Sequence, residues 1–395
     1  MHRSRDPIGC STIPPASVIA SGTTLSEHRG FACTGVRHGT TGDDLMVTII
    51  GGGIAGSALA GGLARHGIPV TLHEQQSTGS AGGAFLFVDG RGHAALRHLG
   101  LDDEQVAAAS YPLDGLDYAD SRGVRSAMPS RGHRFWLRRE LIALLEKFAD
   151  ESGADVRRGE PVTGLDRDGD GHILRAEGRD IAADGPIIAA DGIDSVVRTR
   201  LEPDRVPVYA GDVVLYGMTT AAVPDLPTTP AVLHFDAEIA ADGTGAATFG
   251  HLWRPGDETA WWFVRIARPP LPGAADDLGL RPVGDWADAV LAATPTRRAL
   301  AESFLARTEV VHVSNARNVP LDGARPPSDP ILLIGDADHA ITPAAGVGAR
   351  DALEDADAVF AALLTGDSPA AAMAERRTRI LADRAATRRG APRRT

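Results

Sequence analysis

The chain has 395 residues, of which 43% are hydrophobic and 23% are charged, with a formal net charge of −12 and a pI of about 5.5. Its length and composition are typical of a globular protein with more than one hydrophobic core. The acidic balance argues against nucleic acid and anionic lipid as binding partners.

Residues 1–45 are rich in Ser, Thr, Gly and Pro and show no periodicity, so we expect a disordered extension. No long apolar run follows its basic start, which argues against a signal peptide. The only cysteines of the chain, Cys10 and Cys33, lie in this segment. The remaining residues therefore exclude a disulfide framework and a cysteine-based zinc site, and we expect a cytoplasmic protein.

Residues 46–64, MVTIIGGGIAGSALAGGLA, carry no charge and are compatible with two structures. Their number is almost sufficient for one membrane-spanning helix. Three successive glycines and the lack of flanking aromatic residues disfavour that helix. The alternative is a strand at 46–50, a glycine loop, a helix at 57–66 and a second strand at 68–74. We therefore predict a nucleotide-binding βαβ unit and no membrane span.

The glycines after the first strand follow the pattern G-x-G-x-x-G. In such a loop the first glycine permits a tight turn, the second lets the backbone approach a pyrophosphate, and the third lets helix and strand pack closely. Free N–H groups and the helix dipole favour phosphates at the helix N-terminus. The predicted cofactor residues of the loop are Gly51, Gly53, Ile54, Ala55 and Gly56. Glu74 ends the second strand and is placed to accept hydrogen bonds from ribose hydroxyls.

The rest of the chain contains further predicted helices and strands. Apolar spacing predicts a helix at 137–152, and short apolar runs predict buried strands at 187–190 and 331–334. Residues 205–300 contain several strand-like runs separated by turn residues, which is typical of a mostly antiparallel sheet inserted into an α/β domain. Two helices are predicted beyond residue 348, and we interpret the arginines of the second as a solvated face with a frayed tail.

Two downstream motifs bear on which dinucleotide is bound. In ILLIGDADHAITPAAGVGARDALEDA, residues 331–356, a strand ends at Gly335 and Asp336, and Pro343 precedes a second glycine loop that opens a helix. The residues of this second loop are Gly346, Val347 and Gly348.

The second motif is IIAADGIDSVVR, in which Asp191, Gly192, Ser195 and Arg198 form the pattern DGxxSxxR. Between the two glycine loops, WLRRELIALL also places Arg138 at the start of a predicted helix. In the order and spacing of these elements the chain resembles the FAD-dependent monooxygenases of the aromatic-hydroxylase type, the family of p-hydroxybenzoate and phenol hydroxylases.

The resemblance extends over about residues 46–381 and implies that the dinucleotide is FAD. Asp336 would bind the ribityl or pyrophosphate region. Pro343 and the second glycine loop would lie against the flavin, whose reduced, anionic pyrimidine edge is stabilised by backbone N–H groups. Arg138 would lie beside the flavin, and Gly82–Gly83 would let a loop approach its other face.

Some positions of the motifs leave their role open. Asp191 and Ser195 would serve FAD, or would form a strand-to-helix turn with an N-cap. Asp338 stands where the family usually has Ala, and Arg350 where it usually has Asn. We hypothesise that Arg350 contacts a bound anion or an acidic partner. We interpret His339, in the same motif, as structural.

The resemblance also implies an activity. NAD(P)H, as a transient co-substrate, would reduce FAD, and O2 would then form a C4a-hydroperoxide that oxygenates a small aromatic or polyketide-like substrate. The chain has one dinucleotide cradle, which suits a transient visit of NAD(P)H. Alternatives are an oxidase, a reductase or a halogenase on the same scaffold, although the WxWxIP motif of halogenases is missing. A non-catalytic FAD-binding protein is a further alternative. The protein would be a monomer or a homodimer.

The sequence predicts no catalytic residue on the substrate side. The phenols of Tyr209 and Tyr216 would hydrogen-bond a substrate hydroxyl or belong to the core. Trp261 and Trp262 are expected to pack the sheet, and no cluster of histidines indicates a metal site.

These elements together predict an α/β fold with a Rossmann-like FAD-binding domain that is discontinuous in sequence, formed by residues 46–204 and 301–366. Residues 205–300 would form the inserted, mostly antiparallel β-sheet substrate domain. Residues 367–395 would form a C-terminal helix and basic tail.

Overall fold

The computed structural model describes residues 46–77, 85–169, 171–183, 185–223, 226, 229, 231–254, 257–272 and 277–390. The expected disordered extension at 1–45 and Gly82–Gly83 lie outside the described residues. None of the helices that the structure describes combines the length and apolar character that a membrane crossing requires. The uncharged run after Met46 forms a strand, a loop and a helix, as predicted.

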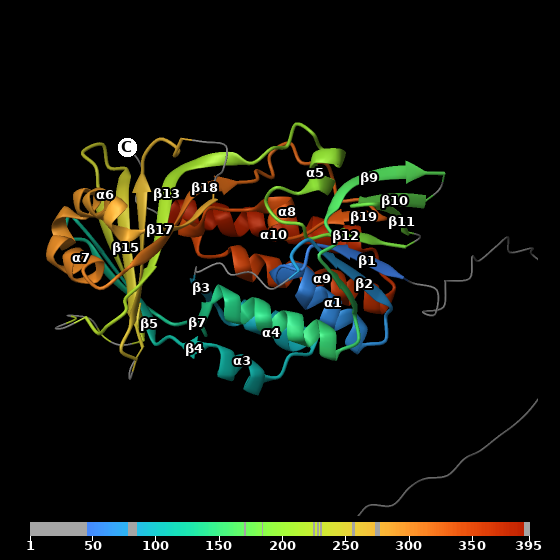
Figure 1. Cartoon of the computed structure of the whole chain (residues 1–395), viewed down its shortest axis with the longest axis horizontal. Coiled ribbons are helices and arrows are strands. Elements are labelled where there is room, and N and C mark those ends of the chain that lie inside the picture. The colour runs from blue at the N-terminus through green and yellow to red at the C-terminus, as the bar shows by residue number, and fades with distance from the viewer. Residues whose placement is uncertain are drawn as a thin grey trace, which may run out of the picture. The chain divides into compact units, whose positions relative to one another are not determined.

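A five-stranded parallel sheet forms the centre of the FAD-binding part (Figure 1). Its strands, in spatial order, are β19 (Ile331–Leu333), β12 (Ile187–Ala189), β1 (Val47–Ile50), β2 (Val70–Glu74) and β8 (Asp155–Arg158). All four strand pairs are parallel. Because both faces of such a sheet are covered, β1 and β12 are apolar or small throughout and fully buried.

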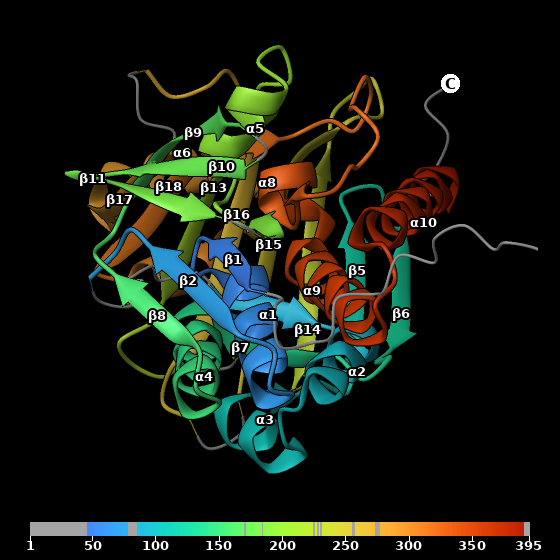
Figure 2. The ribbon, with the colours of Figure 1, turned by 90° about the vertical axis from the view of Figure 1, so that its right-hand side faces the viewer.

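Helices pack on one face of this sheet around a shared apolar core. They are α1 (Ile54–Arg65), α2 (Gly90–Leu99), α3 (Asp103–Ala109), α4 (Arg138–Glu151) and α9 (Gly348–Thr365). The last helix, α10 (Pro369–Gly390), lies against α9 (Figure 2). The predicted βαβ unit, the helix at 137–152 and the two C-terminal helices are thus confirmed.

The other face of the parallel sheet is covered by a small antiparallel sheet that the sequence did not reveal. It consists of β9 (Val162–Asp168), β10 (Gly171–Ala176) and β11 (Arg179–Ala183), next to α5 (Val196–Leu201). Leu165 and Leu174 of this sheet pack with Ile187 of the parallel sheet in one apolar cluster. Short, strongly charged strands with few apolar residues carry little pattern, which is why they were missed.

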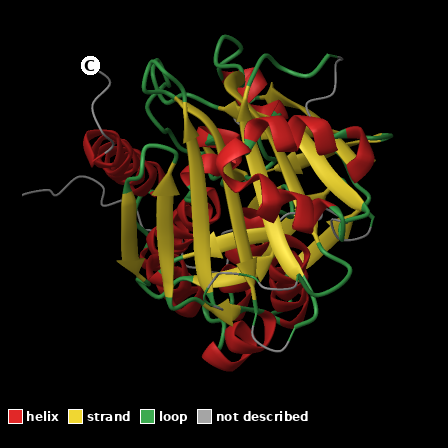
Figure 3. Cartoon of the chain, turned by 90° about the vertical axis from the view of Figure 1, so that its left-hand side faces the viewer, coloured by secondary structure: helices red, strands yellow, loops and turns green. Residues whose placement is uncertain are grey.

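An eight-stranded sheet forms the remaining layer, with helices over its outer face (Figure 3). Its neighbours are antiparallel except for β14 and β5, which are parallel. In spatial order the strands are β17 (Asp277–Pro282), β18 (Val310–Asn318), β13 (Val208–Met218), β16 (Ala260–Ala267), β15 (Gly245–Trp253), β14 (Val232–Ile239), β5 (Gly115–Asp120) and β6 (Arg125–Pro129). The covering helices are α6 (Ala287–Ala293) and α7 (Arg298–Leu305).

The mostly antiparallel sheet is therefore confirmed, but its strands are not confined to residues 205–300. Strands β5 and β6 come from before this range and β18 comes from after it. A three-stranded sheet, β3 (Phe85–Val88), β7 (Arg134–Leu137) and β4 (Tyr111–Pro112), contributes side chains to one apolar cluster with the eight-stranded sheet. The division of the chain at 46–204, 205–300 and 301–366 stays a prediction.

Close packing between β1 and α1 requires a glycine at the start of the helix. A Cβ atom on Gly56 would lie 1.9 Å from the carbonyl oxygen of Gly51, a contact with backbone that no side-chain rotation relieves. Gly53 differs, because a Cβ atom there would meet nothing within 4 Å. The two glycines of one loop thus serve different purposes, one for packing and one for open access.

We expect Gly56→Ala to lower the free energy of unfolding by about 3 kcal/mol, since helix or strand must shift to relieve the overlap. Gly53→Ala is the matched control in the same loop and should cost less than about 1 kcal/mol, the usual penalty of alanine at an N-cap. Urea denaturation of both variants measures the difference. Equal stability of the two variants would contradict the packing role of Gly56.

Candidate functional site

Three strand ends meet at one edge of the parallel sheet. Because β1, β12 and β19 are parallel neighbours, the residues that follow them, Gly51, Asp191 and Asp336, lie at the same carboxyl edge. Gly51 has φ +98°, and a Cβ atom on it would lie 2.4 Å from the carbonyl oxygen of Ala190. The three sequence motifs, distant along the chain, therefore form one site.

The first glycine loop is held by the acid at the end of β2. The Glu74 carboxylate accepts hydrogen bonds from Gly52 N, at 2.6 Å, and from Gln76 N, at 2.7 Å. Ser57 Oγ donates to Gly52 O at 2.8 Å and fixes the loop from the helix side. Glu74 lies where the ribose contact was predicted and keeps acceptor capacity, because a carboxylate accepts about four hydrogen bonds. The ribose contact itself stays a prediction.

The helix that follows the loop begins at Ile54, with Gly53 as its N-cap and no side-chain acceptor. The N–H groups of the first turn, including those of Ile54 and Ala55, have no acceptor within the helix. At the N-cap, a Cβ atom on Gly53 would have no neighbour within 4 Å among the described residues. This arrangement fits an anionic group that approaches the backbone directly.

Asp191 caps the short helix α5, as the alternative interpretation of its motif suggested. Its Oδ2 accepts hydrogen bonds from Val196 N at 2.8 Å and from Val197 N at 3.3 Å. Ser195 Oγ accepts from Arg198 N at 2.9 Å and is a second cap of the same helix. Asp191 Oδ1, however, is buried without a hydrogen-bond partner among the described residues, and burial raises the pKa of this carboxyl. An unpaired buried oxygen at this edge fits a polar ligand group.

Arg198, the last residue of this motif, is structural. Its guanidinium is buried and donates to the carbonyl oxygens of Arg205, at 3.0 Å, and Ala337, at 2.9 Å. It therefore ties α5 to α8 (Asp336–His339), the short helix after β19.

Asp336 is the exposed residue of α8, whereas Ala337, Asp338 and His339 are buried. Surrounding protein nevertheless raises the pKa of the Asp336 carboxyl, and the positive charges of His339 and Arg138 oppose the rise. Arg138, the first residue of α4, is therefore close enough to Asp336 for their charges to interact, as expected for two residues beside one cofactor.

The second glycine loop also presents free backbone. A single 3-10 turn, Pro343–Ala345, leads into Gly346, which has φ +64° and space around its Cα. Helix α9 then begins at Gly348 with Val347 as an N-cap that offers no side-chain acceptor. Thr342 Oγ1 is buried beside this loop without a hydrogen-bond partner among the described residues. Both glycine loops thus end in helix N-termini that suit an electron-rich ligand edge.

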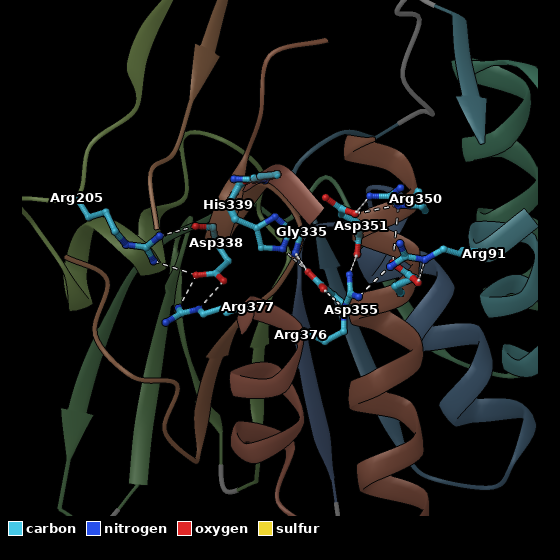
Figure 4. A network of polar contacts seen from close by, with 12 residues as sticks. Arg91, Arg205, Gly335, Asp338, His339, Arg350, Asp351, Asp355, Arg376 and Arg377 are labelled. Carbon is cyan, nitrogen blue, oxygen red and sulfur yellow. Dashed lines mark hydrogen bonds and ion pairs between the residues drawn. The ribbon is translucent and has the colours of Figure 1, made fainter. Parts of the chain in front are cut away.

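Buried ion pairs surround the turn at Gly335–His339 and the start of α9, as Figure 4 shows. Arg350 contacts the acids Asp351, at 2.7 Å, and Asp89, at 3.4 Å, so that its acidic partners lie within the chain. His339 Nε2 donates to Asp355 Oδ2 at 2.6 Å. Burial acts to lower the pKa of His339, but the Asp355 carboxylate outweighs burial and raises it.

The interpretation of the C-terminal arginines as a solvated face was wrong for Arg376 and Arg377, and also for Arg384, which is half-buried and donates through Nη2 to His339 O at 2.7 Å. The side chains of Arg376 and Arg377 are only 6% and 12% exposed, because they pair with buried acids. Helical periodicity cannot distinguish a solvated arginine from a buried one whose acidic partner is distant in sequence.

An aromatic cluster lies between the eight-stranded sheet and β7, next to the start of α4. Tyr216 packs edge-on against Phe85 at 5.4 Å between ring centroids, and Phe135 lies 5.7 Å from Trp261. A cavity of about 260 Å³ opens against this cluster, and its walls include Tyr111, Phe135, Leu137, Leu252, Arg254 and Trp261. Leu137 directly precedes Arg138, which links the cavity wall to the cofactor edge.

The structure distinguishes the roles of the two tyrosines and of the two tryptophans, which the sequence alone left open. Tyr209 donates its hydroxyl to Arg268 O at 2.7 Å, whereas the Tyr216 hydroxyl makes no hydrogen bond within the described part of the chain. Trp262 is buried and donates to Thr308 Oγ1 at 3.0 Å, so its predicted packing role is confirmed. Trp261 points to the other face and lines the cavity, so packing alone does not describe it. Alternation along β16 would have separated the two tryptophans.

The sequence-based reasoning missed the cavity walls from the first half of the chain. Phe85 and Phe135 lie on β3 and β7, which pair with each other. Their short runs, FLFV and RFWL, did carry the apolar and aromatic signal of strands.

Comparison with known proteins agrees with this geometry. The sequence profile of the family described as FAD binding domain matches residues 44–379. Kynurenine 3-monooxygenase of Salinispora arenicola is 29% identical over 351 residues, which are 83% of this chain and 74% of the relative. The 3-amino-4-hydroxybenzoate 2-monooxygenase PtmB3 of Streptomyces platensis is 27% identical over 348 residues, 78% of this chain and 77% of that protein.

Solved structures share the fold. The 2,6-dihydroxypyridine-3-hydroxylase of Arthrobacter nicotinovorans superposes with a TM-score of 0.69 at 19% identity, covering 86% of this chain and 88% of that one. HpxO of Klebsiella pneumoniae, solved with FAD and uric acid, has a TM-score of 0.66 at 22% identity and covers 85% of this chain and 84% of that one. The profile match, the two relatives and the convergent motifs confirm the predicted family: the chain belongs to the FAD-dependent monooxygenases of the aromatic-hydroxylase type.

Proposed function

We propose that the protein is a single-component monooxygenase that uses NAD(P)H and O2 to hydroxylate a small aromatic or polyketide-like substrate. In this reaction NAD(P)H is oxidised, one oxygen atom enters the substrate as a hydroxyl group, and the other leaves as water. The observation that supports it is a cavity with aromatic walls, whose lining residue Leu137 directly precedes Arg138 at the proposed FAD edge. Tyr216, whose phenol makes no hydrogen bond within the described residues, lies in the aromatic cluster beside this cavity.

The residues at the sheet edge fit FAD, because Asp191 Oδ1 and Thr342 Oγ1 are buried there without a partner in the described part of the chain, and both glycine loops offer open backbone. Gly51, Gly53 and the first turn of α1 would hold the pyrophosphate, and Glu74 would face the ribose. Asp336, with Arg138 nearby, would bind the ribityl or pyrophosphate region. Pro343 and the loop Gly346–Gly348 would face the ring. When bound, FAD would supply the electron transfer and the oxygen transfer.

The chain itself would exclude water and orient the substrate. The ring cluster offers stacking surfaces, and a cavity of about 260 Å³ favours a small substrate. Burial raises the pKa of the Tyr216 hydroxyl, which therefore stays protonated and would donate a hydrogen bond to a substrate oxygen. One relative is named for an aminohydroxybenzoate, which supports an aromatic substrate.

The test uses the purified protein. A flavin absorption spectrum and extraction of FAD would establish the cofactor, and a screen of aromatic compounds would follow NAD(P)H oxidation and O2 uptake. We expect one substrate class to stimulate NAD(P)H oxidation, with one O2 consumed per hydroxylated product. If every compound gave only hydrogen peroxide, the protein would be an oxidase and the proposal would be wrong. Cytoplasmic location and a monomeric or dimeric state stay predictions.

Gly53→Ala should weaken FAD binding by about tenfold, because the added methyl group occupies the side from which a pyrophosphate reaches the backbone. The comparison is with Gly67→Ala, a site at the end of α1 where a Cβ atom also meets nothing within 4 Å, although φ is +76°. Titration of the apoprotein with FAD, followed by flavin fluorescence, gives both affinities. Unchanged affinity of Gly53→Ala would place the pyrophosphate elsewhere.

Tyr216→Phe should lower kcat/KM by about tenfold on the substrate found in the screen, since one hydrogen bond to the substrate is lost. More of the NAD(P)H consumed should also yield hydrogen peroxide instead of product. Tyr209→Phe removes a hydroxyl that is already bonded to Arg268 O and should leave both quantities unchanged. If the two variants behaved alike, Tyr216 would have no role in substrate orientation.

A further inference from the structure

The turn that carries Asp336 is held by two buried acids. Gly335, whose φ is +58°, donates its N–H to Asp355 Oδ2 at 3.0 Å, and His339 at the other end donates to the same oxygen at 2.6 Å. Between them, Asp338 is fully buried and points toward Arg205 and Arg377 (Figure 4). Asp336 is thus the exposed side chain of a turn whose other positions are fixed.

Each of these acids is held in turn by an arginine of α10. Arg376 Nε donates to Asp355 Oδ1 at 2.9 Å. Arg377 binds Asp338 through two parallel bonds, Nε to Oδ2 at 2.8 Å and Nη2 to Oδ1 at 2.6 Å. Such a fork-to-carboxylate contact fixes distance and angle, which a single point charge does not. Of these two consecutive residues, Arg376 acts through Asp355 on both ends of the turn and Arg377 acts on Asp338 between them, as Figure 4 shows.

Asp338 also connects the turn to the segment that leads into strand β13. Arg205, in the segment between α5 and β13, donates through Nη2 to Asp338 Oδ1 at 3.0 Å. The Nε of Arg205 donates to Glu202 Oε2 at 2.8 Å. Two acids and two arginines thus form a neutral buried cluster, in which the charge of Asp338 is satisfied from two sides.

The placement of these arginines on α10 is unusual for a helix that only packs. Ala370, Met373 and Ile380 form the buried stripe of α10, and Arg376 lies on the same stripe with Arg377 beside it. Apolar residues at these positions would bind the helix at least as strongly, because burying charges costs free energy. What the arginines add is directional contact with the flavin turn.

We propose that Arg376 and Arg377 are positioning residues of the FAD site, which act through Asp355 and Asp338 on the turn that presents Asp336. The inference rests on the proposed contact between Asp336 and FAD. Asp338 and Arg377 link α8 directly to α10. Helix α10 is therefore part of the cofactor site without touching the cofactor.

The test measures FAD binding by the full-length apoprotein and needs no NAD(P)H, O2 or substrate. We expect Arg377→Gln and Arg376→Gln to weaken FAD binding by about tenfold or more, the usual effect of losing a residue behind a ligand contact. Arg379→Gln changes an exposed arginine of the same helix and should leave affinity unchanged. If Arg377→Gln and Arg376→Gln bound FAD as Arg379→Gln does, the inference would be overturned.

A second variant separates positioning from stability. Asp338→Ala combined with Arg377→Met removes both charges, so its thermal midpoint should recover toward that of the unchanged protein, because Arg205 keeps Glu202. Its FAD affinity should remain about tenfold weaker, since the turn has lost its link to α10. Recovery of affinity together with the thermal midpoint would show a structural role only and overturn the inference.

Hydrogen exchange and one reference variant complete the test. In the apoprotein, Arg376→Gln should speed amide exchange at Gly335 and His339 but not in β1, and equal exchange in both would contradict positioning.

Asp336→Ala shows whether the proposed contact between Asp336 and FAD exists. Unchanged affinity there would overturn the proposed FAD contact, and the inference with it. Weak binding by Asp336→Ala with normal binding by Arg377→Gln would overturn the inference alone.

Discussion

The parallel pairing of β1, β12 and β19 is the constraint on which the site depends. It brings the ends of three strands, separated by more than a hundred residues at each step along the chain, to one edge of one sheet. Parallel strands need long connections, and these connections carry the small antiparallel sheet and the large one. The eight-stranded sheet, where we propose that the substrate binds, is thus built into the crossovers that the parallel sheet requires. Any shift of register between these strands would separate the glycine loop from Asp336.

The cofactor edge could be predicted from the sequence because its requirements are local. Gly51 and Gly56 are demanded by contacts within a few residues or with the neighbouring strand, and their spacing is visible in the sequence alone. The same holds for the turn at Asp191, where the cap of α5 lies within the motif itself. For Asp191, however, the sequence could not decide between a cap and a ligand. One of its oxygens caps the helix, and the other has no hydrogen-bond partner among the residues that the structure describes.

The substrate side could not be predicted because its residues come together only through long-range pairing. Phe85, Phe135 and Tyr216 lie on three strands of two sheets, and no spacing along the chain connects them. The parallel pairing of β14 with β5 adds strands from before residue 205 to a sheet that was expected to end there. The aromatic character of each run was visible, but the face on which each ring lies depends on register, which a single sequence leaves open.

The proposed cofactor edge consists largely of open backbone, and buried ion pairs support it from behind. Where a phosphate or a flavin would meet the chain, the structure offers glycine and open backbone N–H groups, which approach closely and carry only partial charge. Apart from Glu74, Arg138 and Asp336 at the edge itself, buried ion pairs stand one layer behind. In Arg376 with Asp355 and Arg377 with Asp338, each charge is neutralised by its partner. The positions of these backbone N–H groups depend on the conformation of their loops. Those loops contain glycines, which lose much conformational entropy when they are fixed. Paired charges in the layer behind are directional and strongly coupled, so they suit the task of fixing such a loop. Arg376 and Arg377 are therefore explained by buried acids of the same chain, without an external polyanion.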